Sequence, residues 1–201
     1  MRNIRNELSS TAQYFHQKGW MLGTAGNLSA KETANSFWIT ASGQSKGALT
    51  DAQYIEINLE GDILRQPNEA LKPSAETSIH QAAYTLFPEM NACLHVHMVE
   101  GNWVCDDHPN QNFIALPPIE MLKGFGWKQG SAYILVTENH DFVPQIAEDM
   151  LRFYQQNFDG FIVPGFLIRG HGITTWGTDI EHARNRIELF SFLFSYMCRP
   201  K

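Results

Sequence analysis

Two histidines separated by one residue, His95 and His97, are the part of the sequence best suited to chemistry. They lie in a short, mostly apolar run at residues 92–97, which is typical of a strand. In a strand, residues i and i+2 point to the same face, so both imidazoles can bind one metal ion. His171 is the leading candidate for a third ligand, because glycines flank it at the end of another predicted strand. Three neutral imidazoles suit zinc or another borderline divalent ion and leave positions open for a substrate oxygen.

Two glutamates, Glu76 and Glu120, are candidates for acid–base chemistry beside such a metal ion. Glu120 lies in the segment 117–124, where we expect an apolar setting suited to proton transfer. Glu76 lies in the first turn of a predicted helix, where a carboxylate commonly complements the helix dipole. Each carboxylate therefore has a structural as well as a catalytic interpretation.

Three short segments offer hydrogen-bond donors for a phosphate group. Residues 23–29 form a glycine-containing loop, residues 42–43 form a predicted tight turn, and residues 74–76 open a helix whose N-terminal amides favour an anion. The candidate ligands in these segments are Gly26, Asn27, Ser42, Gly43 and Ser74. No lysine follows the glycine loop as it would in a P-loop, and no dinucleotide-binding fingerprint is present.

Hydrophobic periodicity and turn residues predict the elements that must position these side chains. The predicted helices cover residues 1–18, 74–86, 117–124, 143–154 and 180–194, and the predicted strands cover residues 37–40, 54–59, 92–97, 132–137 and 160–169. Residues 106–112 are polar and are predicted to form a surface loop. Strands mixed with helices, without a repeat or a linker, predict a single α/β domain over residues 1–201 in which helices cover a sheet.

Composition narrows the class of protein. The 201 residues are 43% hydrophobic, enough for a sizeable core, and their net charge of −6 gives no general attraction for nucleic acid or an acidic membrane surface. Three cysteines make a disulfide framework an unfavourable interpretation. The N-terminal residues lack the apolar core of a signal peptide, and no apolar stretch is long enough to span a membrane. We therefore expect a soluble, cytoplasmic protein without nucleic-acid or membrane partners.

Five motifs, in this order, resemble the class II aldolase/adducin family. They are GTAGNLS (23–29), ITASG (39–43), KPSAE (72–76), HVH (95–97) and RGHG (169–172). The resemblance implies a three-layer α/β/α domain with a largely antiparallel central sheet, one zinc ion, a ketose phosphate substrate and a homotetramer with active sites near subunit contacts. The implied zinc ligands are His95, His97 and His171, and the implied phosphate ligands are Asn27, Ser42, Gly43 and Ser74.

The segments IEMLKG (119–124) and GHGITTWG (170–177) resemble a branch of this family that removes water from a ketose phosphate. That match implies that Glu120 takes and returns a proton. Sugar-phosphate aldolases of the family use a glutamate at the position of Glu76, so retro-aldol cleavage and a related epimerisation stay open. A non-enzymatic alternative is an adducin-like interaction module. Such a module would lack the histidine ligands, and all three histidines are present here. The family has two adjacent serines on the phosphate side of its site, whereas this chain has Ser74 followed by Ala75.

Overall fold

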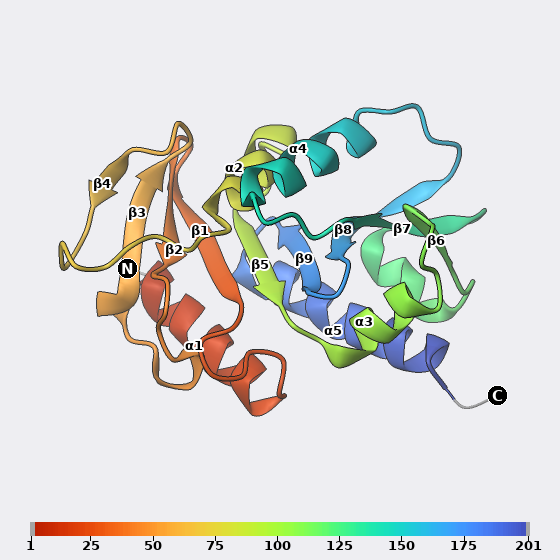
Figure 1. Cartoon of the computed structure of the whole chain (residues 1–201), viewed down its shortest axis with the longest axis horizontal. Helices are drawn as coiled ribbons and strands as arrows, with labels where there is room; N and C mark the ends of the chain where they lie inside the picture. Colours follow the sequence, from red (N-terminus) through yellow and green to blue (C-terminus); the bar gives the residue numbers. More distant parts are fainter. Residues whose placement is uncertain (1–2, 200–201) are drawn as a thin grey trace.

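A nine-stranded sheet runs through the computed structural model, which describes residues 3–199 (Figure 1). The strand order is β4-β3-β2-β1-β5-β9-β8-β7-β6, and within it only β7 and β8 pair in parallel. The strands are β1 (Asn27–Thr33), β2 (Ser36–Thr40), β3 (Tyr54–Asn58), β4 (Ile63–Arg65), β5 (Ala92–Val96), β6 (Phe113–Leu116), β7 (Ala132–Thr137), β8 (Phe161–Ile168) and β9 (Gly172–Gly177). The predicted α/β class with a largely antiparallel sheet is confirmed.

Helices cover both faces of this sheet, which gives the three layers that the family resemblance implied (Figure 1). The α-helices are α1 (Ile4–Gln17), α2 (Thr77–Leu86), α3 (Val99–Asp106), α4 (Val143–Tyr154) and α5 (Ile180–Met197), and the 3₁₀ helices are η1 (Lys46–Ala48), η2 (Asp51–Gln53) and η3 (Glu120–Phe125). Apolar residues of α2 and α4 form a core with one face of the sheet. Those of α1, α3, α5 and η3 form a second core with the other face. In the described residues no helix combines the length and the apolar sequence needed to cross a membrane.

The alternation of side chains along β5 decides which layer receives the two strand histidines. Leu94 and Val96 pack in the core on the α1 and α5 side, whereas Cys93 packs in the core on the α2 and α4 side. Successive residues of a strand point to opposite faces. His95 therefore points to the α2 and α4 side, and His97, which directly follows the strand, keeps the same direction.

Several elements lie outside the predicted set, namely β1, β4, β6, β9, α3 and the 3₁₀ helices η1 and η2. The loop predicted over residues 23–29 is wrong in its second half, because β1 begins at Asn27. Polar and apolar residues do alternate at the start of this strand, but they follow the glycines at 23 and 26 directly, and the polar side chains of Asn27 and Ser29 are buried among hydrogen-bond partners. Helix α3 carries Gly101 in its interior, where glycine disfavours a helix. The helix predicted from Ser74 begins instead at Thr77.

Candidate metal centre

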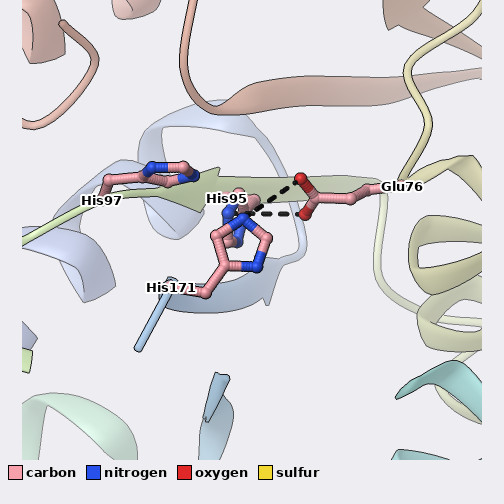
Figure 2. Close-up of side chains that lie close together, drawn as sticks. All are labelled: Glu76, His95, His97 and His171. Carbon is pink, nitrogen blue, oxygen red and sulfur yellow. Dashed lines mark ion pairs between the residues drawn. The ribbon is translucent and has the colours of Figure 1, made fainter. Parts of the chain in front are cut away.

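Glu76 and three histidines meet at the carboxyl end of β5, with their side chains directed toward one another (Figure 2). The ring centroids of His95 and His97 lie 4.9 Å apart, and the ring of His171 lies 4.8 and 4.6 Å from them respectively. Sheet topology explains why residues so distant in sequence meet. Strand β9 pairs antiparallel with β5, with Ile173 opposite Val96, so the turn before β9 lies beside the end of β5. Glu76 reaches the same place from the N-cap of α2.

The polar atoms of this group have the arrangement expected of metal ligands. One ligand atom from each of the four residues lies within 4.8 Å of the others. The buried Nε2 atoms of His95 and His97 and the buried Oε2 of Glu76 have no hydrogen-bond partner. Such unpaired buried atoms are costly unless a ligand pairs with them. Imidazole and carboxylate groups in this number suit a divalent cation, so the residues present can hold one.

Hydrogen bonding and burial keep the imidazoles in the form that binds a metal. The Nδ1 of His95 lies 2.9 Å from Oγ1 of Thr174, so a proton on Nδ1 leaves Nε2 free to coordinate. Burial, together with the neighbouring histidines, holds the pKa of His95 well below its usual range. Burial also lowers the pKa of His97 to about 4, and it lowers that of His171. All three rings are therefore neutral near pH 7.

The carboxyl group of Glu76 is buried beside these rings. Its oxygens lie 3.4 Å from Nε2 of His95 and 3.6 Å from Nε2 of His171. Burial raises the pKa of Glu76 to about 7, although hydrogen bonding from the Asn27 side chain and the charge of Lys46 act in the opposite direction. Glu76 is thus placed either to join the histidines as a ligand or to exchange a proton beside them.

Two glycines allow the backbone to pack closely around His95. Gly26 has a φ of +78°, and a Cβ there would lie 2.8 Å from the carbonyl oxygen of His95. A Cβ at Gly172 would collide with the carbonyl oxygen of Val96 and would lie 3.1 Å from the rings of both His95 and His97. Gly26 thus has a packing role at this end of β5, whether or not it also binds a ligand.

The segments predicted to bind phosphate gather near this group. The backbone N–H of Ser42 donates to the carbonyl of Lys72, which places the exposed turn at Ser42 and Gly43 beside the chain that leads into Ser74. The hydroxyl of Ser74 accepts a hydrogen bond from the backbone N–H of Glu76. Asn27 is buried on β1 opposite His95. Their predicted role in holding an anion stays a prediction.

Lys46 also belongs to this region, although the sequence analysis did not select it. Its side chain is only 1% exposed, and Nζ donates to the carbonyl oxygens of Thr24, at 2.8 Å, and Gln44, at 2.9 Å. Its backbone N–H donates to the carbonyl of Gly23. A lysine therefore does close the glycine loop, from about twenty residues further along the chain. A motif search confined to neighbouring residues cannot find such a lysine.

Replacing Lys46 by methionine should weaken the binding of an anion at these loops. An ammonium group has three N–H donors, and two of them are used by carbonyl groups. A charged hydrogen bond contributes about 1.5–3 kcal/mol, so we expect inorganic phosphate to bind about 10–100-fold more weakly to Lys46→Met. Calorimetric titration of the metal-loaded protein measures this, with exposed Lys128→Met as the control. Equal phosphate affinities of wild type and Lys46→Met would contradict the role.

Within one chain, Glu120 lies away from the group formed by Glu76 and the three histidines. It begins η3, whose Phe125 ring packs 4.6 Å from that of Phe190 in α5, on the side of the sheet opposite to α2. The apolar setting predicted for Glu120 is wrong, because its side chain is 81% exposed and pairs with Lys123 at 3.0 Å. The surrounding apolar residues turn inward and leave the carboxylate in solvent. Within one chain, Glu120 is not part of the histidine and Glu76 group.

His80, a buried residue of α2, should make the stability of the protein depend on pH. Burial lowers the pKa of His80 to about 3, whereas the ordinary value is 6.5. Between these values the unfolded chain binds more protons than the native protein, so stability falls as pH drops from 6.5 toward 3. We expect wild type to lose about 1.4 kcal/mol more per pH unit than His80→Gln in this interval. Urea unfolding at a series of pH values measures both slopes, and parallel curves would refute this expectation.

Comparison with known proteins agrees with the fold. Residues 6–198 match the model of the class II aldolase and adducin N-terminal domain, and the chain belongs to this family. The predicted family resemblance is thereby confirmed.

Individual relatives are more specific. The chain is 43% identical over 201 residues to a methylthioribulose-1-phosphate dehydratase from Microcystis aeruginosa. The alignment covers 98% of this chain and 96% of that protein. It is 37% identical to a protein of the same name from Leptospira biflexa, over 96% of this chain and 95% of that protein. Among solved structures, L-fuculose-1-phosphate aldolase from Thermus thermophilus superposes with a TM-score of 0.73 at 18% identity, over 96% of this chain and 93% of that one, and shares the fold.

Proposed function

We propose that this protein is a hydro-lyase that dehydrates 5-methylthioribulose 1-phosphate to 2,3-diketo-5-methylthiopentyl 1-phosphate, a reaction of methionine salvage. The observation that carries the proposal is the group of three histidines and Glu76, in a chain 43% identical over nearly its whole length to a dehydratase of that name. The whole of residues 1–201 would act as one catalytic domain on a small phosphorylated sugar in the cytoplasm.

A zinc ion is the proposed cofactor, one in each subunit, held by His95, His97 and His171. Bound there, a divalent cation supplies Lewis-acid stabilisation of the negative charge that develops next to the substrate's carbonyl group. Iron, cobalt, nickel and manganese are also compatible with three imidazoles. Metal analysis of the purified protein distinguishes them. The buried neutral rings support the proposal, because a metal binds the neutral form of histidine.

Glu120 is the proposed acid–base residue. Its carboxylate takes the proton from C3 and then donates that proton to the hydroxyl that leaves C4. The C3–H and C4–O bonds break, one water molecule departs, and the remaining enol becomes the second ketone. One carboxylate can do both steps if the proton and the hydroxyl lie on the same face of the substrate.

The proposed assembly is a homotetramer in which Glu120 of one copy serves the metal centre of a neighbouring copy. Two observations support this arrangement. Glu120 is 81% exposed, and η3 lies on the face of the sheet opposite to Glu76. An exposed carboxylate that cannot serve its own centre is available to a second chain. The phosphate group of the substrate would lie among Gly26, Asn27, Ser42, Gly43 and Ser74, with Lys46 beside them.

The alternative is retro-aldol cleavage of a ketose 1-phosphate with Glu76 as the acid–base residue. The position of Glu76 beside His95 and His171 supports this alternative reaction. Mass spectrometry of the products separates the two reactions. Incubation of the metal-loaded protein with 5-methylthioribulose 1-phosphate should yield one product that is lighter by one water. Two carbon fragments would favour the aldolase, and an isomer of unchanged mass would favour an epimerase.

A further inference from the structure

A buried hydrogen-bonded chain of four polar side chains lies directly behind Glu76. The Nε2 atom of His80, on α2, lies 2.5 Å from Oδ1 of Asn27. The Nδ1 atom of the same ring lies 2.7 Å from Oγ of Ser29. The Ser29 hydroxyl lies in turn 2.7 Å from the hydroxyl of Tyr84. All four residues are at most 3% exposed. Asn27 and Ser29 come from β1, and His80 and Tyr84 come from α2, so the chain of contacts joins the sheet to the helix that carries Glu76.

The donors and acceptors of this network allow one arrangement of protons when Glu76 is ionised. A neutral imidazole has one N–H and one acceptor nitrogen. An amide oxygen only accepts, so Nε2 of His80 carries the proton that is donated to Asn27. Nδ1 must then accept from Ser29, whose own oxygen accepts from Tyr84. Burial lowers the pKa of His80 to about 3, which keeps the ring neutral.

The same arrangement fixes the orientation of the Asn27 amide. With Oδ1 held by His80, the NH₂ group is the part of Asn27 left to face the carboxylate of Glu76, and hydrogen bonding from Asn27 stabilises the ionised form of that carboxylate. A flipped amide would turn its oxygen toward the carboxylate and set two acceptors against each other. The flipped amide would also require His80 to carry its proton on Nδ1.

We propose that His80 is a positioning residue: by donating from Nε2 to Asn27, it holds the Asn27 amide with its N–H groups toward Glu76 and so orients that carboxylate beside the three histidines. The effect on catalysis rests on the proposed dehydration, whereas the hydrogen-bond arrangement does not. The oxygen of the Asn27 amide is thereby committed to His80, and one of its two N–H donors is committed to Glu76.

Two isosteric substitutions separate the two nitrogens of His80. The amide nitrogen of glutamine can take the place of Nε2, whereas that of asparagine can reach only the place of Nδ1. Loss of a group that orients residues at a metal site typically costs 10–100-fold, so we expect His80→Asn to lower kcat by about that factor. The kcat of His80→Gln should be at least about tenfold higher than that of His80→Asn. Metal content and a cooperative urea transition are measured for both variants. Equal kcat values for two folded, metal-loaded variants would overturn the proposal.

Nitrogen-15 NMR of histidine-labelled, metal-loaded wild type provides the second test, independent of any substrate. At pH 8 the His80 ring should be neutral with its proton on Nε2. Assignment uses His80→Gln, in which that signal disappears. A proton on Nδ1 would overturn the proposal even if the enzyme is active. If the NMR result is as expected but the wild type does not dehydrate the substrate, the proposed function fails and the arrangement of His80 stands.

Discussion

Replacing His171 by alanine is expected to abolish the bound metal ion and to lower the rate of dehydration by about 1000-fold or more. A divalent cation contributes several kcal/mol of charge stabilisation in the transition state, and each 1.36 kcal/mol corresponds to a factor of ten in rate. His171 is the most informative of the proposed ligands to change. Its side chain is 19% exposed and lies in a turn, so its loss should disturb the fold less than the loss of fully buried His95.

The measurement combines metal analysis with turnover of 5-methylthioribulose 1-phosphate. His140→Ala is the matched control, because His140 pairs with Asp149 at 2.8 Å and lies outside the candidate metal group. The control should bind metal and turn over substrate like wild type. Treating wild type with a chelator should reproduce the loss, and adding zinc should reverse it. A His171→Ala protein that keeps its metal and its turnover would remove His171 from the site.

Glu120→Gln should lower the rate of dehydration by about 100–10,000-fold, the usual cost of losing a general acid or base. Glutamine has nearly the same size and cannot exchange the proton. Because the side chain is 81% exposed, the change should leave folding and metal content intact. Glu60→Gln, at another exposed position, is the control and should retain turnover. Near-normal turnover by Glu120→Gln would withdraw the assignment.

Mixing two inactive variants tests whether Glu120 acts on a neighbouring copy. In an assembly of His171→Ala and Glu120→Gln chains, some centres would combine an intact metal group from one chain with an intact Glu120 from the other. We expect unfolding and refolding the two variants together to restore part of the wild-type turnover. No recovery in assemblies verified to contain both chains would mean that Glu120 does not serve a second copy.

The sequence predicted the grouping of the three histidines better than the elements around it. The spacing of His95 and His97 in an apolar run is a local signal, and the glycines around His171 mark a turn, so both could be recognised from neighbouring residues. Glu76 was selected as an acid–base candidate, but its place against two histidines depends on where α2 meets β5. That contact depends on packing between distant segments, which local patterns do not encode.

Two residues near the site show what such patterns miss. Lys46 closes the glycine loop through contacts with Gly23 and Thr24, and His80 is fixed by partners on β1. In sequence each is a single polar residue without a motif. Their importance comes from burial together with hydrogen bonding, which only the folded chain displays. The exposure of Glu120 was missed for the opposite reason, since apolar neighbours in sequence do not surround the side chain in space.

Strand β5 is hydrogen-bonded on both edges, to β1 and to β9, and this has a consequence for how the protein acquires its cation. Of the three proposed ligands, His95 lies on an interior strand that the sheet already immobilises, His97 directly follows that strand, and the turn bearing His171 is tied to β9. Little ordering of the polypeptide is left to accompany metal uptake. The protein without its metal ion should accordingly remain folded and should bind the ion again quickly. Small zinc domains differ in this respect, because they fold only when their metal ion is bound.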